Sequence, residues 1–489
     1  MEKLNNATTP LNNKGELLIN VTIYHFSWLQ LVILSLSIIL LGCYSIIVYY
    51  AAHQPFQSDF GIFYNSLQLF IHHQNIYNSL FYPTSMTTLS MHPASAINLN
   101  LPLFSVLLLP LAYLNYLHAF IAWTGISLLF SLISLIIFFQ HYIKKEAIPL
   151  TPLNINSKYA YLFLPAFFIY FPNFVSVQFG QVSLALLLPF MAMWLAARKN
   201  KPITAGLLLG VLISIKPFFA LFLLFFIFRR EWTIIKGCLL TVAFAFAIVS
   251  IIFGNSIFVD YQHTLSSLKL FNSSWNASLY GFIGRIWGIS GEKNTPIWNL
   301  PFLTTVLYSS LSMLLVLMLW RINKIKSNLT VLTQFDLCFS FATVIMLLIS
   351  PLGWMYYFSF LIIPFTIIYS LAQQCRYSFL IRIILGIALL LSSMPHDFLV
   401  NDQVYSLSDI FGSGGYYFYA LCLLTLLLLW VQSSAMKTQA YSNKNSHFFL
   451  QSLGSITIPS RYYFLYYAIL LLPSLQGILV TIAGLSSHS

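Results

Sequence analysis

The sequence contains few charged residues. Only 7% of its 489 residues are Asp, Glu, Lys or Arg, and 59% are hydrophobic. Soluble domains carry about 25% charged residues, so this composition excludes a soluble enzyme held by a single anchor. The first apolar run is too long for the core of a cleavable signal peptide. We expect an all-α, polytopic integral membrane protein.

Cysteines are scarce as well. The chain has five, scattered in or beside apolar runs, and no two have the CxxC spacing that is typical of metal sites. It also lacks a Gly-rich phosphate loop and an HExxH motif. The cysteine pattern argues against a metal site and a disulfide framework.

Acidic residues are the rarer charged type, with 11 in the whole chain. Asp59 is the only acid between Glu16 and Glu146. The paired carboxylates that would hold a divalent ion are therefore missing next to it in the sequence, although Asp260 or Asp397 can still approach in space. We expect neither a metal nor a cofactor.

The basic residues indicate the orientation in the membrane. The net charge is +12, which in a soluble protein would suggest nucleic acid as a partner. Here, all but four of the 23 Lys and Arg residues fall in tails and short loops that alternate with apolar runs. By the positive-inside rule, these loops and the N-terminus are cytoplasmic, and Asp59 is extracytoplasmic. No nucleic acid is expected.

Apolar runs divide the rest of the chain. We expect about 11–13 transmembrane helices, some of them short or broken. The runs are 28–50, 102–116, 118–141, 159–175, 181–197, 203–216, 218–228, 233–253, 300–320, 337–350, 355–373, 379–394, 415–432 and 463–483. Two full spans over residues 102–141 would put Lys144 and Lys145 on the wrong face, so we expect 102–116 to span only partly or to be re-entrant.

These runs define six segments of the chain. They are a cytoplasmic tail (1–27), a membrane module with a first extracytoplasmic loop at 51–101 (28–253), an extracytoplasmic loop (254–299), a second membrane module (300–432), a cytoplasmic linker (433–462) and a last helix with the C-terminus (463–489).

Two pairs of short runs are broken at polar residues. One break is Gln178-Phe179-Gly180-Gln181, and the other is Lys216-Pro217. Proline interrupts a helix, and irregular backbone at membrane depth occurs where it is buried in protein or lines a wet cavity. We expect both breaks to face a cavity. The alternatives are helix packing through Gly180 and a snorkelling Lys216.

Asp59 lies a few residues beyond the end of the first apolar run and is a candidate general base. The segment Gly61 to His73 after it is amphipathic, with Phe63, Leu67 and Phe70 on one face, and can lie in the membrane interface. A carboxylate can accept a proton from an attacking hydroxyl. The alternative is a solvated Asp59 that only marks the end of a helix.

The other polar groups expected on the outer side suit a sugar attached to a lipid phosphate. Lys216 or Arg285 can neutralise phosphate. Aromatic side chains can stack on sugar faces. The candidate substrate-binding residues are Gln181, Lys216, Asn276, Arg285, Trp354, Tyr356 and Tyr357. Asn276 can alternatively be a turn residue, and Arg285 can contact a phospholipid headgroup.

Ordered motifs between about residues 57 and 365 resemble glycosyltransferase family 87. They are Asp59-Phe60 to Tyr64, His73-Gln74-Asn75-Ile76-Tyr77, Asn98-Leu99-Asn100-Leu101-Pro102, Pro110-Leu111, Trp123, Gly180-Gln181, Ala205-Gly206 with Gly210, Lys216-Pro217, Asn276-Ala277-Ser278-Leu279 with Arg285, and Ser350-Pro351 with Trp354. The resemblance implies a C-type (GT-C) membrane glycosyltransferase fold, Asp59 as the catalytic base, and polyprenyl-phosphate mannose or a similar lipid-linked sugar as the donor.

One position departs from the family pattern. The family often continues Ser-Pro-x-x-Trp with a His pair, where this chain has Tyr356-Tyr357. Histidine there would meet the donor phosphate, whereas tyrosine donates a hydrogen bond without a positive charge.

The function expected from these observations is transfer of a sugar, a hexose such as mannose or a pentose, from a polyprenyl-phosphate carrier to a hydroxyl of a lipid or glycan acceptor. A single base without a second nucleophile indicates direct displacement and inversion. The alternatives are a transporter or flippase for lipid-linked sugars, a polysaccharide polymerase or ligase, and an inactive relative of the transferases.

Overall fold

The computed structural model describes residues 28–53, 59–77, 98–138, 140–141, 166–266, 272–288, 296–325, 329–372, 375, 377–395 and 407–442, together with 473 and 476. Within these ranges the chain is helical and forms no β-strand. The all-α, polytopic fold class is therefore confirmed. The expected N-terminal tail (1–27), and the last helix apart from residues 473 and 476, lie outside the described residues.

The first part of the chain, up to the 254–299 segment, contains both long and short helices. In chain order they are α1 (Trp28–Ala52), α2 (Asp59–Ile71), α3 (Pro102–Leu108), η4 (Leu109–Tyr113), α4 (Tyr116–Phe138), α6 (Phe171–Gln178), α7 (Ser183–Arg198), α8 (Pro202–Ile215), η6 (Pro217–Ala220), α9 (Leu221–Phe228) and α10 (Trp232–Phe253).

The remaining elements begin inside the segment that the sequence suggested to be a loop. They are α11 (Ser256–Ser266), α12 (Leu279–Trp287), α13 (Pro301–Lys324), α14 (Val331–Ile349), η7 (Met355–Leu361), α15 (Ile362–Ala372), α16 (Ser378–Ser393), α17 (Leu407–Phe411), η9 (Ser413–Gly415) and α18 (Tyr416–Ser442). Helix α18 continues ten residues beyond position 432, the expected end of the second membrane module, and so includes the first part of the expected linker.

Six described helices are long and apolar enough to cross a membrane, and five shorter apolar helices accompany them. The full-length ones are Tyr116–Phe138, Trp232–Phe253, Pro301–Lys324, Val331–Ile349, Met355–Ala372 and Tyr416–Ser434. The short ones include Pro102–Tyr113. Twelve helical residues cover about 18 Å of a ~30 Å hydrocarbon core, so this segment does not span fully, as expected.

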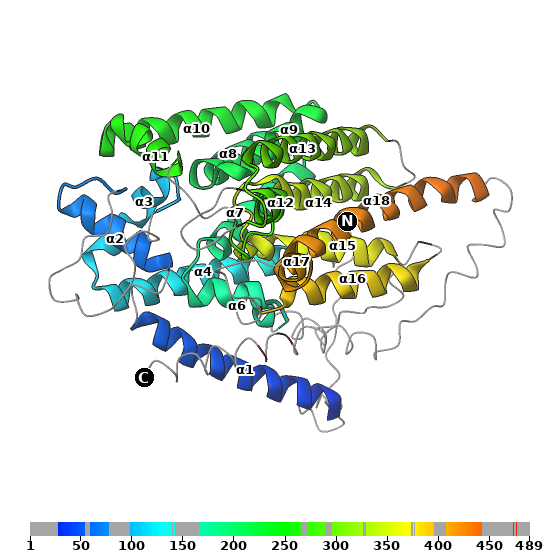
Figure 1. The fold of residues 1–489 in the computed structure, drawn as a ribbon, viewed down its shortest axis with the longest axis horizontal. Coiled ribbons are helices and arrows are strands. Elements are labelled where there is room, and N and C mark those ends of the chain that lie inside the picture. The colour runs from blue at the N-terminus through cyan, green and yellow to red at the C-terminus, as the bar shows by residue number, and fades with distance from the viewer. Residues whose placement is uncertain are drawn as a thin grey trace, which may run out of the picture.

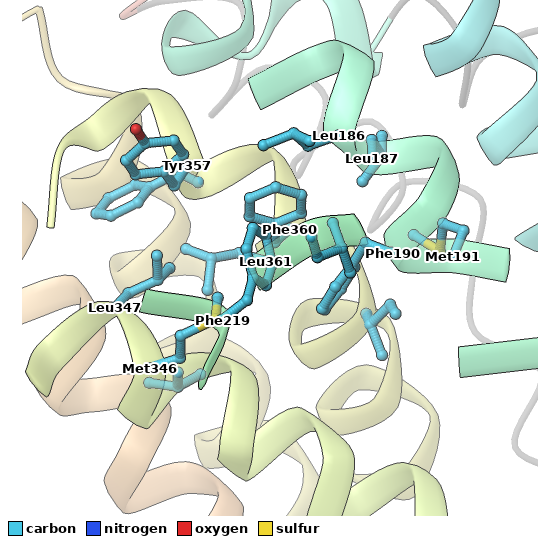
Figure 2. Packing of buried hydrophobic residues seen from close by; sticks show 14 of the residues in the cluster. Leu186, Leu187, Phe190, Met191, Phe219, Met346, Leu347, Tyr357, Phe360 and Leu361 are labelled. Atoms are coloured by element: carbon cyan, nitrogen blue, oxygen red, sulfur yellow. The ribbon is translucent and has the colours of Figure 1, made fainter. Parts of the chain in front are cut away.

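The helices form one bundle around an apolar core. Helices α10 and α8, α13 and α14, and α18, α15 and α16 lie side by side, while α1 runs along one edge of the bundle (Figure 1). Helices α8 and α10 approach closely at Gly206, where an added Cβ would lie 2.2 Å from the carbonyl oxygen of Ile234. Small residues permit such backbone contact between membrane helices. The core itself is rich in Phe and Leu side chains (Figure 2).

Both expected breaks are present. Helix α6 ends at Gln178 and α7 begins at Ser183, with Gly180 between them at a φ of +63°. Helix α8 ends at Ile215, and Lys216 has an extended backbone before η6 begins at Pro217. Breaks of this kind leave polar groups of the backbone and side chains available inside the bundle.

The bundle has two distinct ends. At one end, which we call the basic end, Arg198 at the close of α7 pairs with Asp336 near the start of α14 at 3.0 Å. The C-terminal end of α9 lies at the same end of the bundle, because the Arg229 guanidinium lies 5.1 Å from the centroid of the Phe335 ring. The two helix breaks lie at the opposite end, since α7 begins and α8 finishes there.

Helix α2 packs on protein rather than presenting an open apolar face. The Phe63 ring contacts Phe104 of α3 at 5.0 Å between centroids, and Phe70 contacts Phe253 of α10 at 4.8 Å. Leu67 is fully buried. The apolar face that was expected to lie in the membrane interface therefore holds α2 against the bundle.

Candidate active site

Asp59 lies at the first position of α2 and is joined to the first break. The Gln181 side chain donates a hydrogen bond from Nε2 to Oδ2 of Asp59. The backbone N–H of Phe60 donates to the carbonyl oxygen of Phe179 over 3.0 Å. A carboxylate at a helix N-terminus is also favoured by the helix dipole. These contacts hold the carboxylate in one place against the first break.

Gly180 allows this junction to be so tight. An added Cβ at this position would lie 2.6 Å from Cβ of Phe60. The Trp123 indole Nε1 donates to the Gly180 carbonyl oxygen over 2.7 Å, which fixes the break against α4 as well. The positive φ of Gly180 is one that other residues rarely adopt. Glycine is thus required both by the backbone angle and by the close approach of α2.

Lys216 supplies a positive charge from the second break. It is buried, and its Nζ lies 5.7 Å from the centroid of the Tyr357 ring. Within the part of the chain that the structure describes, the ammonium group of Lys216 has no hydrogen-bond acceptor, although its backbone N–H donates to the Leu212 carbonyl oxygen at 2.8 Å. A hydrogen bond of 3.3 Å from the Leu101 N–H to the Ile215 carbonyl oxygen ties the second break to the start of α3. The ammonium group therefore remains able to bind an anion.

The environment of Asp59 shifts its acidity. Burial raises the pKa of Asp59 to about 6, against the opposing effects of the Gln181 hydrogen bond and the Lys216 charge. The carboxylate is then largely ionised at neutral pH, yet more basic than an ordinary aspartate. Such a group is suited to accept a proton from a hydroxyl.

The predicted site residues fall into two groups. Asp59, Gln181, Lys216 and Tyr357 come together, and Tyr357 is close enough to Asp59 for an electrostatic interaction. Asn276, Arg285, Trp354 and Tyr356 gather around the turn that follows α14. The two groups meet at Phe179, whose ring lies 5.8 Å from Trp275 and 6.3 Å from Tyr356.

Asn276 is directed toward backbone rather than toward the Asp59 group. It is fully buried, and its Oδ1 accepts hydrogen bonds from the N–H groups of Ser278 at 3.1 Å and Gly353 at 3.0 Å. Its Nδ2 donates to the carbonyl oxygen of Pro351 at 2.7 Å. An isolated β-bridge also joins Asn276 to Trp354. These bonds connect the start of α12 to the turn after α14.

Arg285 supports the same connection. It is 1% exposed, and its NH1 group donates to the carbonyl oxygens of Ser273 at 2.9 Å and Asn276 at 3.1 Å. Trp354 and Tyr356 lie at and after the turn, and the Tyr356 ring packs 5.3 Å from Trp275. In this structure the second group therefore supports the wall of the site behind Phe179.

Sequence reasoning missed one residue near the Asp59 group. Tyr261 of α11 lies in the segment that was expected to be an extracytoplasmic loop, and no motif pointed to it.

Asp260, the residue before Tyr261, interacts electrostatically with Tyr77. Asp397 lies outside the described residues. No group of three or more His, Cys, Asp or Glu side chains able to hold a metal occurs in the described ranges.

Comparison with known proteins gives one family. The sequence model of Glycosyltransferase family 87 matches residues 99–351, just over half of the 489-residue chain. No curated protein and no solved structure matched. The matched region includes both breaks, Asn276 and Arg285. Asp59 lies before it, and Trp354, Tyr356 and Tyr357 lie after it.

Proposed function

The chain belongs to glycosyltransferase family 87, and we propose that it transfers a sugar from a polyprenyl-phosphate carrier to a hydroxyl of a lipid or glycan acceptor. The sugar is mannose or another hexose or pentose. Transfer inverts the anomeric configuration, with Asp59 as the general base. The observation that carries this proposal is the Asp59 carboxylate, held by Gln181 and lying close to the charge of Lys216.

The proposed reaction is a single displacement. Asp59 accepts the proton of the acceptor hydroxyl as its oxygen forms a bond to the anomeric carbon. The bond from that carbon to the phosphate oxygen breaks, and its electron pair leaves with the lipid phosphate. Phosphate is a good leaving group without protonation, so one carboxylate is sufficient. A carboxylate with a pKa near 6 is matched to accepting a proton at neutral pH.

Lys216 is proposed to bind the phosphate of the donor. It is the one cation placed beside the Asp59 group in the described residues, and its ammonium group has no protein hydrogen-bond acceptor there. Arg285 was the other candidate, but its NH1 donates to backbone carbonyl oxygens. Arg285 is therefore proposed to act on the donor only indirectly, by supporting the Trp275 and Tyr356 side of the pocket.

We propose that the site faces the extracytoplasmic side, with the N-terminus in the cytoplasm. Arg198 ends α7, Lys199 and Lys201 follow it, and Arg229 and Arg230 follow α9. They lie at the basic end, and Asp59 lies at the other. The positive-inside rule associates such clusters with the cytoplasm. The broken helices and terminal site are consistent with a GT-C-type architecture.

A transfer assay tests the proposal. Purified full-length protein in nanodiscs is incubated with radiolabelled polyprenyl-phosphate mannose and a membrane lipid extract as the acceptor pool. We expect a labelled product, with a loss of about 10²-fold or more for Asp59→Asn, the size expected on removing a general base. The matched control is Glu231→Gln, the same carboxylate-to-amide change at the basic end, which should keep wild-type activity.

Two results would contradict the proposal. Equal transfer by the wild type and Asp59→Asn would remove Asp59 as the base. If no lipid-linked sugar gave a product, and the wild type instead moved the donor across a vesicle membrane, the protein would be a transporter.

A further inference from the structure

A tyrosine of α11 lies close to the Asp59 group although 45 residues separate it from Lys216 in the sequence. The Tyr261 ring is 5.6 Å from that of Tyr77, centroid to centroid. The Tyr77 hydroxyl donates to the carbonyl oxygen of Asn100 at 2.8 Å, and the next residue, Leu101, is bonded to Ile215 beside Lys216. These contacts link Tyr261, through Tyr77 and the start of α3, to the second break.

Tyr261 and Tyr357 belong to two different apolar clusters. Tyr261 belongs to a small apolar cluster formed by Ile76, Tyr77, Val249 and Ile257, whereas Tyr357 belongs to the main core. Leu103 packs against both clusters, so they adjoin. The two phenols are close enough to interact electrostatically. The Lys216 Nζ lies 5.7 Å from the centroid of the Tyr357 ring.

The hydroxyl groups of Tyr261 and Tyr357 are not used by the fold. Both residues are buried, at 8% and 2% exposure. Within the described ranges neither hydroxyl has a hydrogen-bond partner. In Figure 2 the Tyr357 hydroxyl points away from the labelled apolar side chains. A buried hydroxyl without a partner costs stability, so a ligand that supplies an acceptor is favoured here.

We propose that Tyr261 is a further substrate-binding residue, and that its hydroxyl, with that of Tyr357 and the ammonium of Lys216, donates hydrogen bonds to the phosphate of the lipid-linked donor. This inference rests on the proposed function. Burial raises the pKa of Tyr261 to about 12, so it remains a protonated donor at neutral pH. Two phenols and one ammonium give several donors with a single positive charge, which matches the single charge of a phosphodiester.

Tyr77 provides a matched control for the experiment. It is the ring partner of Tyr261 and has nearly the same burial, but its hydroxyl has a protein acceptor, the Asn100 carbonyl. Tyr77→Phe therefore removes a structural hydrogen bond, whereas Tyr261→Phe removes a hydroxyl that the fold does not use. The two variants separate a ligand contact from a fold contact.

Binding is measured on full-length protein in nanodiscs with two probes, polyprenyl phosphate and the corresponding polyprenol without phosphate. Tm is recorded on the same samples. For Tyr261→Phe we expect binding of polyprenyl phosphate to weaken about tenfold, as for one hydrogen bond to a charged group. Binding of polyprenol should not change, and the Tm should not fall. Tyr77→Phe should lower the Tm.

The outcomes distinguish the two proposals. If the wild type binds both probes equally, there is no phosphate site, and the proposed function and the role of Tyr261 both fail. If the wild type prefers polyprenyl phosphate and Tyr261→Phe keeps that preference in full, only the role of Tyr261 fails. A Tm loss for Tyr261→Phe as large as that for Tyr77→Phe, with no selective loss of phosphate binding, would make its hydroxyl structural and also overturn the inference.

Discussion

Gln181 donates a side-chain hydrogen bond to Asp59 across 122 residues of sequence. The bond joins the start of α2 to the break between α6 and α7. It places an amide donor on a carboxylate that burial would otherwise make a weaker acid. Gln181 therefore controls the ionisation of Asp59 as well as its position.

Removing this donor should shift the pH dependence of transfer. A hydrogen bond to the ionised form lowers the pKa of a carboxylate, so Gln181→Leu should raise the pKa of Asp59 above about 6. Because the base acts when ionised, wild-type kcat/KM should fall as the pH drops below about 6. In Gln181→Leu this acid limb should move to higher pH, with a larger loss of rate at pH 6.5 than at pH 8.

The control is Gln178→Leu, the same change at the other glutamine of the break, which makes no hydrogen bond to Asp59. Its pH profile should match that of the wild type. An unshifted profile for Gln181→Leu would mean that Gln181 does not affect the ionisation that limits the rate.

Replacing Lys216 should separate activity from stability. Lys216→Met removes the cation proposed to bind phosphate. We expect kcat/KM to fall about 10- to 100-fold, the size expected when a hydrogen bond between charged groups is lost. A buried charge without a hydrogen-bond acceptor is costly, so the Tm should be at least that of the wild type. Activity and Tm are measured on the same preparation.

Lys236→Met is the control for the loss of a lysine charge, since Lys236 is exposed near the start of α10. It should leave kcat/KM unchanged. Wild-type kcat/KM in Lys216→Met would show that phosphate is bound elsewhere.

Asn276 should matter for folding more than for donor binding. Asn276→Ala leaves the buried N–H groups of Ser278 and Gly353 without their acceptor. Each unsatisfied buried group costs about 1–3 kcal/mol, so we expect a clear drop in Tm and in yield. The affinity of the remaining folded protein for polyprenyl phosphate should change less than in Lys216→Met. A strong loss of that affinity at an unchanged Tm would instead show that Asn276 binds the donor.

The sequence predicted the position of the breaks because proline, glycine and polar residues interrupt apolar runs in a visible way. It also indicated Asp59, Gln181, Lys216 and Tyr357 as site residues, and these do come together. The pattern contains no information on side-chain direction. Asn276 has the same polar character whether it faces a ligand or, as here, the backbone of the neighbouring turn.

Tyr261 could not be found from the sequence for a different reason. Its segment follows α10 and lacks a long apolar run, so hydropathy alone suggests a loop. Helix α11 forms there, and its position depends on the contact between Tyr261 and Tyr77. Contacts between segments so distant in the chain depend on how the helices pack, which a local pattern does not contain.

Gly180 and Gly254 offer a final test of how the Asp59 group is held. Both have positive φ values, +63° and +80°. An added Cβ at Gly180 would lie 2.6 Å from Cβ of Phe60, whereas at Gly254 nothing lies within 4 Å. Gly254→Ala should therefore cost backbone strain alone, about 1–3 kcal/mol, and keep wild-type activity per folded molecule.

Gly180→Ala adds a steric contact to the strain. Because the new methyl group would push against Phe60, it would displace Asp59, the residue before it, from Gln181. We expect Gly180→Ala to lose at least tenfold in kcat per folded molecule, the loss expected when a catalytic group is misplaced, together with a lower Tm. Both variants are compared in nanodiscs at the same concentration of folded protein. Equal activity in the two would mean that Asp59 keeps its position without the close approach of α2 to the break.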